Sequence, residues 1–333
     1  MTDLHSDLDG KSILITGGTG SFGRAFVRRI LSEANPKRVI VFSRDEQKHH
    51  AMQSEFHDPR LRYFVGDVRD VNRLNMALRS VDVLIHAAGM KHVHLCEYNP
   101  IEAINTNVLG TVNVIQAALA QNVQKVVGIS TDKAVAPANL YGASKLCLEK
   151  LLVAANSYSG ERGTRFSVVR YGNVMGSAGS VIPLFLKQRE QGKLTITDSR
   201  MTRFWIDMNG AIDLVLQALS LMHGGEIFLP KLPAASVEAL ADTLAPGVPR
   251  EVIGIRPGEK LHESLLSPEE CRRTKDLGPL LVVDPEYPSW SMGPPRGVPV
   301  PADFKYSSDR DDLLLSEAQI SALLSGAGWK QTA

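Results

Sequence analysis

The chain has 333 residues, of which 44% are hydrophobic and 6% aromatic, and its 37 Lys and Arg residues nearly balance its 36 Asp and Glu residues. This length and composition exclude a disordered chain and a mini-scaffold, and predict one large domain or two intimately joined ones. The net charge of +1 excludes a broadly basic nucleic-acid binder, so any anionic ligand must be held by locally placed groups.

Apolar runs of strand length alternate with segments of helical period over the first half of the chain. This alternation is typical of βα units and predicts an α/β fold, a Rossmann-type doubly wound parallel sheet. We expect strands at 12–16, 38–43, 62–65, 81–86, 125–130 and 166–171, and helices near 22–32, 45–56, 71–78, 100–121 and 141–157. In such a sheet, ligands bind outside the carboxyl ends of the strands.

Beyond residue 172 the alternation fades into segments punctuated by glycine and proline, with helices expected near 209–222 and 237–244. We therefore predict a Rossmann domain over 1–172 with returning elements near 204–224, and a smaller, interleaved substrate lobe over 173–285. The remainder, 286–333, is expected to be a proline-rich arm, extended over 285–301, followed by a C-terminal helix near 316–324 that docks back.

The first strand is followed by TGGTGSFG, which places Gly17, Gly20 and Gly23 at three-residue spacing before a helix. Glycines allow a tight turn and a close approach of the backbone to a pyrophosphate, whose charge faces the helix N-terminus. A glycine triplet alone can be an ordinary turn, but the strand before it and the helix after it favour dinucleotide binding.

The second strand ends in Ser43 and Arg44 instead of an acidic residue, which favours a 2′-phosphate, and therefore NADP, over the 2′-hydroxyl of NAD. Asp45 follows immediately and complicates the assignment, and Lys48 either adds to the phosphate site or is a solvated lysine. At the next strand ends, Asp67 is placed to meet the adenine amine, and the small residues Ala87 and Ala88 leave room for a dinucleotide.

The fifth strand runs into Ser130, Thr131, Asp132 and Lys133, and Tyr141 and Lys145 follow at a spacing of four. On a helix, two side chains four apart lie on the same face. A neighbouring ammonium and a nicotinamide ribose can lower the pKa of a phenol from its usual value of about 10, which makes a base for oxidising an alcohol. A lone YxxxK is common by chance, but this one follows a hydroxyl-bearing strand end in a dinucleotide fold.

Together, TGGTGSFG, the Ser-Thr strand end and YGASK resemble the extended short-chain dehydrogenase/reductase family, and GNVMGSAGSVIP and RPGEKLHE resemble its nucleotide-sugar branch. STDKA, HAAGMKHVHLCEYNP, RMTRFW and GIRPGEKLHE further resemble the inverting UDP-N-acetylglucosamine 4,6-dehydratases of the pseudaminic acid type. The similarity spans about residues 10 to 285, with an echo in FKYSSDRDD. It implies a lyase on an oxidoreductase fold, with UDP-N-acetylglucosamine as substrate, and a homo-oligomer, either a dimer or a hexamer.

The resemblance implies that Lys133 is the base for the C5 proton and Asp132 the acid serving O6, beside Thr131, Tyr141 and Lys145. An exposed ion pair of little consequence is the alternative. To act as a base, Lys133 needs a pKa well below its reference of about 10.4, through burial or through Lys91 and Lys145. The full NADP set is Gly17, Thr19, Gly20, Ser21, Phe22, Gly23, Ser43, Arg44, Asp45, Lys48, Asp67, Val68, Ala87, Ala88, Tyr141, Lys145 and Val174.

The resemblance also implies a substrate-binding set, in which Arg256 suits a diphosphate and Asn173 a sugar or phosphate oxygen. Trp205 is equally suited to a core, and Glu259 or His262 to fixing a loop. Ala178 and His94 stand where the family pattern has Arg and Pro, which leaves room for an unusual sugar nucleotide. The set is Lys91, Asn173, Ala178, Gly179, Ser180, Val181, Trp205, Arg256, Glu259 and His262.

Two other readings compete with the dehydratase: an epimerase or altered dehydratase on another nucleotide sugar, and a catalytically silent NADP-sensing scaffold. No metal is expected, since His92 and His94 lack an evident third ligand. Cys96, Cys147 and Cys271 are too few and too far apart for a disulfide framework. With no signal-like N-terminus and no run of about 18 apolar residues, we expect a cytoplasmic protein without a membrane partner.

Overall fold

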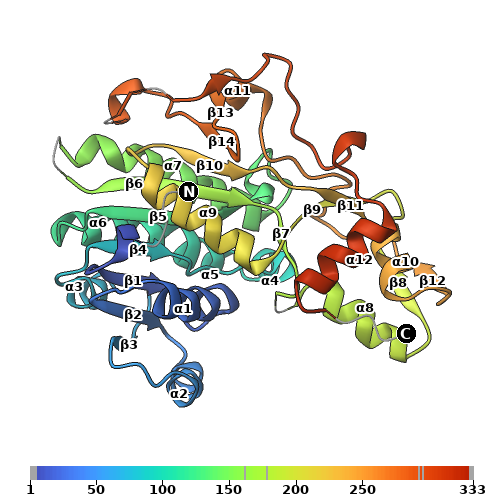
Figure 1. Ribbon diagram of the computed structural model, residues 1–333, viewed down its shortest axis with the longest axis horizontal. Helices are drawn as coiled ribbons and strands as arrows, with labels where there is room; N and C mark the ends of the chain where they lie inside the picture. Colours follow the sequence, from blue (N-terminus) through green and yellow to red (C-terminus); the bar gives the residue numbers. More distant parts are fainter. Residues whose placement is uncertain (1–5, 161–162, 178, 292, 295, 330–333) are drawn as a thin grey trace.

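The computed structural model describes residues 6–160, 163–177, 179–291, 293–294 and 296–329. Its centre is a mostly parallel sheet (Figure 1), and the predicted α/β class is confirmed. The parallel strands are β1 (Ser12–Thr16), β2 (Arg38–Ser43), β3 (Leu61–Val65), β4 (Val83–His86), β5 (Lys125–Thr131), β6 (Arg165–Tyr171) and β10 (Ile227–Pro230).

Antiparallel strands extend the sheet beyond β10, to ten strands among the described residues. The added strands are β14 (Leu280–Val283), β13 (Thr274–Asp276) and β15 (Val298–Pro299), and the order is β15-β13-β14-β10-β6-β5-β4-β1-β2-β3. The strand order reverses between β1 and β4, so their carboxyl ends form the crevice where such sheets bind ligands. Part of the segment predicted as an extended proline-rich arm over 285–301 forms the edge of this sheet, because residues 298–299 pair with β13.

Helices pack against the sheet in two groups (Figure 1). α1 (Ser21–Glu33) contacts α9 (Met208–Leu221), which lies against β5, β6 and β10, whereas α3 (Val71–Ala77) contacts α6 (Gly110–Ala120), which packs with α7 (Leu140–Ala155). α2 (Glu46–Glu55) packs beside β3. The aliphatic strands and the inner faces of these helices form the main hydrophobic core, which fixes the strand ends in place.

The segment predicted as one helix over 100–121 is interrupted by a π turn. α5 (Pro100–Ile104) leads into the π-helix η2 (Asn105–Leu109) and then α6. A further short helix, α4 (Val93–Tyr98), precedes α5 and was not predicted from the sequence. π turns inside helices occur often at functional sites, and this one lies beside the β4 loop.

A second hydrophobic core lies in the C-terminal half and is built around Phe185, Trp205 and Leu240. The elements here are β7 (Asn173–Val174), α8 (Val181–Glu190), β8 (Leu194–Ile196), β9 (Thr202–Ile206), β11 (Ala234–Ser236), α10 (Val237–Leu244), β12 (Arg250–Val252) and α12 (Glu317–Gly326). The short helix α11 (Pro268–Cys271) instead packs on the main core through Cys271. The C-terminal helix α12 contacts α10. The predicted domain boundary at residue 172 stays a prediction.

Single-turn 3-10 helices complete the chain: η1 (Ser6–Leu8), η3 (Asp132–Ala134), η4 (Asn156–Tyr158), η5 (Pro288–Trp290) and η6 (Asp311–Leu313). None of the helices in the described ranges is long and apolar enough to cross a lipid bilayer.

Candidate active site

The glycine loop joins β1 to α1 beneath the end of β4. Gly17 has a φ of +67°, and a Cβ added there would lie 2.9 Å from the backbone of Ala88. A Cβ on Gly23 would collide with the backbone of Gly18, so the helix packs directly on the loop. Only glycine meets both requirements, and the resulting bare turn at the start of a 13-residue helix is a suitable cradle for a pyrophosphate.

The end of β2 presents the side chains that were predicted to choose between NAD and NADP. The hydroxyls of Thr19 and Ser43 lie 2.7 Å apart, and the guanidinium of Arg44 is 58% exposed. The carboxylate of Asp45 caps α2, where it accepts a hydrogen bond from the Lys48 amide at 3.0 Å and pairs with the Lys48 ammonium at 3.1 Å. These contacts with Lys48 lower the pKa of Asp45. Asp45 therefore serves the helix, whereas the guanidinium of Arg44 lies 3.7 Å from the Asp67 carboxylate and its side chain is largely exposed.

Asp67, expected to meet an adenine amine, is bound to Arg69. Its two carboxylate oxygens accept hydrogen bonds from the Arg69 amide at 3.0 Å and from the guanidinium at 2.7 Å. Burial raises the pKa of Asp67, but these bonds outweigh it and lower the pKa overall. Val68, also in the cofactor set, is buried.

At the end of β4, the amides of Ala87 and Ala88 both donate to the Thr16 hydroxyl at 3.2 Å. Asn107, in the π turn, receives a hydrogen bond from the Met90 amide at 2.8 Å and donates to Ser144 on α7 at 2.9 Å. The side chain of Asn107 thus ties the β4 loop to the helix that carries Tyr141. The sequence did not single out Asn107, because a π turn leaves no mark in the hydrophobic period.

The predicted Thr131, Tyr141 and Lys145 meet where β5 ends and α7 begins. Lys145 is buried and donates to the carbonyl of Ile129 at 2.8 Å. Burial lowers the pKa of Lys145 to about 8, although the Glu149 carboxylate raises it. Burial raises the pKa of Tyr141 to about 12, opposed by the Lys133 charge and by a hydrogen bond with Thr131. Without a bound cofactor, the phenol is therefore neutral.

Asp132 and Lys133 lie directly beside this set, and Lys133 contacts more than one carboxylate. The Lys133 ammonium donates to Asp132 Oδ1 at 3.0 Å and to Asn173 Oδ1 at 3.2 Å, and it lies 3.4 Å from Glu263 Oε1. Burial lowers the pKa of Lys133, but the two carboxylates outweigh it, so the pKa is raised above its ordinary value. The resting protein therefore does not show the lowered pKa that a base at Lys133 needs, because Asp132 and Glu263 stabilise its ammonium.

The remaining predicted substrate residues lie on several segments around this point. Trp205 pairs with Asn173 in the β7–β9 register and is buried in the second core. Arg256 and Glu259 lie in a loop that also contains Gly258. The side-chain amide of Asn139, at the start of α7, donates to the Gly258 carbonyl at 2.7 Å and so ties this loop to α7.

Other members of the set have more local contacts. His262 bonds the Thr202 hydroxyl at 2.8 Å, and burial lowers the pKa of Lys91. Gly179 has a φ of +77° and packs against His92, next to Ser180 and Val181 at the start of α8. Val174 follows Asn173 on β7, whereas Ala178 lies outside the described residues.

Buried polar atoms without a hydrogen-bond partner gather in this region. In native proteins such atoms are uncommon and often mark a site that a ligand completes. Within the described ranges there are eight, and five belong to these site segments: Asp132 Oδ2, Ser180 Oγ, Trp205 Nε1, Glu259 Oε2 and Glu263 Oε2. Asp132 belongs to the predicted catalytic set and Ser180, Trp205 and Glu259 to the predicted substrate set, whereas Glu263 was not predicted.

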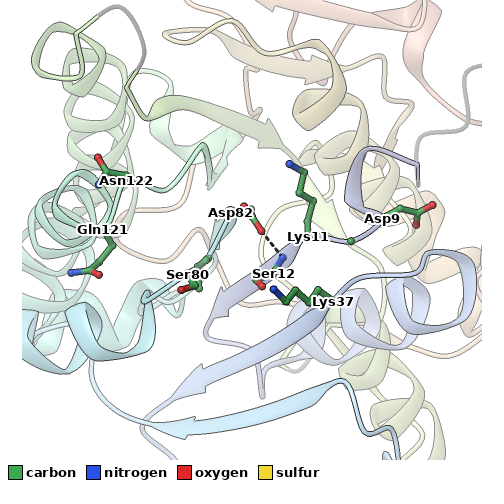
Figure 2. Close-up of a pocket in the computed structure, with 10 residues that line it drawn as sticks. Asp9, Lys11, Ser12, Lys37, Ser80, Asp82, Gln121 and Asn122 are labelled. Atoms are coloured by element: carbon green, nitrogen blue, oxygen red, sulfur yellow. Dashed lines mark hydrogen bonds between the residues drawn. The ribbon is translucent and has the colours of Figure 1, made fainter.

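The opposite end of the sheet carries a separate polar hollow of about 440 Å³. Figure 2 shows that its lining side chains come from the amino ends of the strands, with the Ser12 amide bonded to Asp82. It holds none of the predicted catalytic groups. No group of three metal-ligating side chains occurs among the described residues.

Comparisons with known proteins point in one direction. The family described as "Polysaccharide biosynthesis protein" matches residues 13–285. The inverting UDP-N-acetylglucosamine 4,6-dehydratase of Campylobacter jejuni is 46% identical over 325 residues, which cover 94% of this chain and 97% of that protein. A UDP-glucose 4-epimerase of Rickettsia bellii is 47% identical over 277 residues, covering 80% and 81%.

Among solved structures, the dTDP-glucose 4,6-dehydratase DesIV of Streptomyces venezuelae, crystallised with NAD, superposes with a TM-score of 0.67. It is 26% identical and covers 75% of this chain and 86% of its own. These matches confirm the resemblance to nucleotide-sugar enzymes of the short-chain dehydrogenase/reductase type that the motifs indicated.

Proposed function

The chain belongs to the polysaccharide biosynthesis protein family, and we propose that it is an NADP-dependent 4,6-dehydratase that acts on UDP-N-acetylglucosamine with inversion at C5. The observation that carries this proposal is the Asp132–Lys133 pair, joined at 3.0 Å beside Thr131 and Tyr141. Oxidation at C4 needs only a hydroxyl–Tyr–Lys set, whereas loss of water across C5 and C6 also needs a second base and an acid.

The residues present fit a dinucleotide. Gly17 and Gly23 leave a cradle that a Cβ would fill, and the small side chains of Ala87 and Ala88 leave room beside it. The largely exposed Arg44 at the end of β2 supports a 2′-phosphate, and therefore NADP. When bound, NADP⁺ supplies a hydride acceptor for C4 and later a hydride donor for C6.

In the first part of the reaction, Tyr141 takes the proton from O4. Its pKa of about 12 has to fall for this role, and the positive charge of a nicotinamide ring adds to the effect of Lys133 and of the Thr131 hydrogen bond. Lys145 remains fixed to the Ile129 carbonyl and orients the cofactor ribose.

Elimination requires Lys133 as an amine and Asp132 as a carboxylic acid, the reverse of the resting ion pair. Transfer of one proton from the Lys133 ammonium to the Asp132 carboxylate, along their 3.0 Å hydrogen bond, creates both forms at once. Lys133 then removes the C5 proton, a C5–C6 double bond forms as the C6–O6 bond breaks, and Asp132 protonates the departing O6 to give water. The ion pair is restored, so the chain needs no proton from solvent at this stage.

A second candidate function is a 4-epimerase or altered dehydratase on a different nucleotide sugar, favoured by the identity to the Rickettsia epimerase and by His94 in place of the family's usual proline. An epimerase has no use for a separate acid and base at C5 and C6. A catalytically silent scaffold is disfavoured because Thr131, Tyr141 and Lys145 are all in position.

The test is incubation of the purified protein with UDP-N-acetylglucosamine in D₂O, with NADP or NAD restored to cofactor-stripped enzyme, followed by mass spectrometry and NMR. We expect a product lighter by one water, before deuterium is counted, with deuterium at an inverted C5 and faster turnover with NADP. Unchanged substrate, or an epimer of unchanged mass, contradicts the dehydratase. Lys133→Ala should abolish elimination, and normal turnover of that variant removes Lys133 from its role.

A further inference from the structure

Glu263 is a buried carboxylate on the far side of Lys133 from Asp132. Its side chain is 2% exposed, with Oε1 lying 3.4 Å from the Lys133 ammonium. Oε2 lies 3.5 Å from the Lys260 ammonium but accepts no hydrogen bond. Lys260 itself donates to the carbonyl of Val135, just after the Asp132–Lys133 turn. Burying a carboxylate with one oxygen unsatisfied is costly, so its retention here needs an explanation.

The backbone of Glu263 is fixed by a segment that lies 45 residues further along the chain. The Glu263 amide donates to the Ser308 hydroxyl at 3.0 Å, and the Ser308 amide donates to the Glu263 carbonyl at 2.8 Å. Ser308 is fully buried, and its hydroxyl lies 2.7 Å from that of Thr202 on β9. The backbone that carries the carboxylate is therefore fixed beside Lys133 by these tertiary contacts.

Several charged or titratable groups face Lys133, and Lys260 lies behind them, 3.5 Å from Glu263 Oε2. Asp132 and Glu263 are the carboxylates, Arg203 from β9 is an opposing cation, and Tyr141 from α7 is a neutral phenol in the resting protein. During elimination, Asp132 is still a neutral acid while Lys133 acquires the C5 proton. At that moment Glu263 is the remaining negative charge beside the new ammonium.

We infer that Glu263 is a positioning residue for Lys133, whose fixed negative charge holds the amine at the C5 proton and stabilises the ammonium that forms there. This inference rests on the proposed function and deepens it. The arrangement resembles the logic of a buried aspartate behind a catalytic histidine, in which the carboxylate orients the base and balances its charge without taking the proton.

The decisive variant is Glu263→Gln, which keeps the shape and removes the charge. We expect kcat for dehydration to fall by about 10- to 1,000-fold with little change in KM, because the charge acts on the transition state. The alkaline limb of the pH–rate profile, at which the Lys133–Asp132 pair loses its shared proton, should move to lower pH by about one unit, since an ammonium without its second carboxylate loses its proton more readily. Glu269→Gln, the same exchange at an exposed position of α11, is the control and should match the wild type.

A second measurement reports on the same pair without turnover. Competitive labelling of lysines with acetic anhydride over a pH series, followed by mass spectrometry, gives the titration of Lys133 in each variant. We expect Lys133 to titrate at lower pH in Glu263→Gln than in wild type and Glu269→Gln. If wild type forms no dehydrated product yet this difference is found, the dehydratase proposal fails and the coupling of Glu263 to Lys133 stands.

A folded Glu263→Gln variant with a wild-type alkaline limb and unchanged Lys133 titration overturns the inference, even if its rate is reduced, since that is the result expected of a merely structural residue. If Glu263→Gln does not fold, Glu263→Asp retains the charge at a greater distance. A partial loss of kcat with an alkaline limb at lower pH than that of the wild type supports the inference. Wild-type kcat and an unshifted limb in Glu263→Asp contradict it.

Discussion

Lys145 carries a positive charge in a buried position, behind Tyr141. Its pKa is lowered by burial to about 8 from 10.5, so between these values the folded chain releases a proton that the unfolded chain keeps. Below pH 8 the folded state therefore carries the full cost of the buried ammonium, and this cost is lost as pH rises towards 10.5. We expect Lys145→Met to abolish activity and yet raise the free energy of unfolding at pH 7 by about 1 to 3 kcal/mol.

Urea unfolding at several pH values measures this gain, which should shrink between pH 8 and pH 10. The lost hydrogen bond to the Ile129 carbonyl offsets part of it. Lys187→Met, at an exposed position of α8, is the matched control and should change stability little at any pH. A Lys145→Met variant less stable than wild type at pH 7 would show that the ammonium is not a net cost to the fold.

At the residue scale, sequence reasoning found the groups that motifs mark and missed those that only tertiary structure brings in. The residues Thr131, Asp132 and Lys133 are consecutive, and Tyr141 follows at the start of the next long helix. The strand–helix pattern therefore predicted that all four lie near the end of β5. Glu263 lies 130 positions after Lys133, and no local period links the two. It stood in the quoted RPGEKLHE motif, but nothing there distinguished it from Glu259 and His262.

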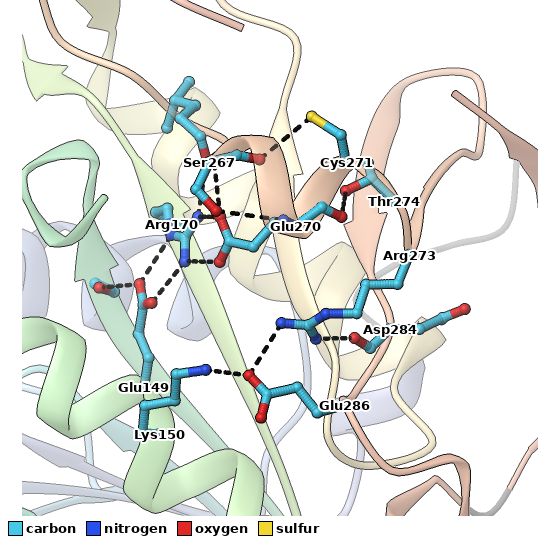
Figure 3. Close-up of polar contacts among 12 residues, drawn as sticks. Glu149, Lys150, Arg170, Ser267, Glu270, Cys271, Arg273, Thr274, Asp284 and Glu286 are labelled. Carbon is cyan, nitrogen blue, oxygen red and sulfur yellow. Dashed lines mark hydrogen bonds and ion pairs between the residues drawn. The ribbon is translucent and has the colours of Figure 1, made fainter. Parts of the chain in front are cut away.

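At the element scale, a buried ion network joins β6, α7 and α11 (Figure 3). Arg170, 1% exposed, donates to both oxygens of Glu149, at 2.9 and 2.6 Å, and to both of Glu270, at 2.9 and 2.8 Å. Glu149 lies one helical turn after Lys145 and also receives the Ser130 hydroxyl at 2.6 Å. The network therefore anchors the catalytic helix to the segment that leads from the Glu263 loop.

Removing the shared cation leaves two buried carboxylates unpaired, so we expect Arg170→Met to lower the free energy of unfolding by about 3 to 5 kcal/mol. Adding Glu149→Gln and Glu270→Gln should restore much of that loss, because the uncompensated charges disappear. Without Arg170, the carboxylates bind protons more readily in the folded state, so the single variant should lose less stability at pH 5 than at pH 8. Urea unfolding of the three proteins tests this, and a triple variant less stable than Arg170→Met would contradict it.

Element type and order were predictable over the first half because each strand is a short apolar run and each helix has a clear period. The π turn at 105–109 and the short helix α4 were not, since one extra residue per turn and six-residue helices do not alter the pattern measurably. The antiparallel strands β13 to β15 were missed because β15 contains a proline and all three are short, and such strands pair only once β10 and β14 provide an edge.

On the scale of the whole molecule, two cores explain why the chain needs 333 residues. The parallel sheet positions the glycine loop after β1 and Tyr141 on α7, whereas the second core contains Trp205 and the start of α8. Glu263 and Ser308 stand in two separate motifs, RPGEKLHE and FKYSSDRDD, and only the folded chain hydrogen-bonds them to each other. Sequence motifs predict the reacting residues, whereas long-range contacts such as that between Glu263 and Ser308 are known only from the folded chain.

Large apolar side chains remain exposed on α4, α5 and η2, which contact the catalytic helix α7. Leu95, Tyr98, Ile101 and Ile104 recur every three residues, with Tyr98 87% and Ile101 71% exposed. Exposed apolar side chains close together in sequence often belong to an interface, and we propose that a second copy of the chain, related by two-fold symmetry, buries them. We expect wild type to sediment as a dimer or larger, and Tyr98→Glu with Ile101→Glu to shift it towards the monomer in sedimentation velocity. Tyr158→Glu, at a 70% exposed tyrosine on η4, should leave self-association unchanged, and equal behaviour of both variants would place the interface elsewhere.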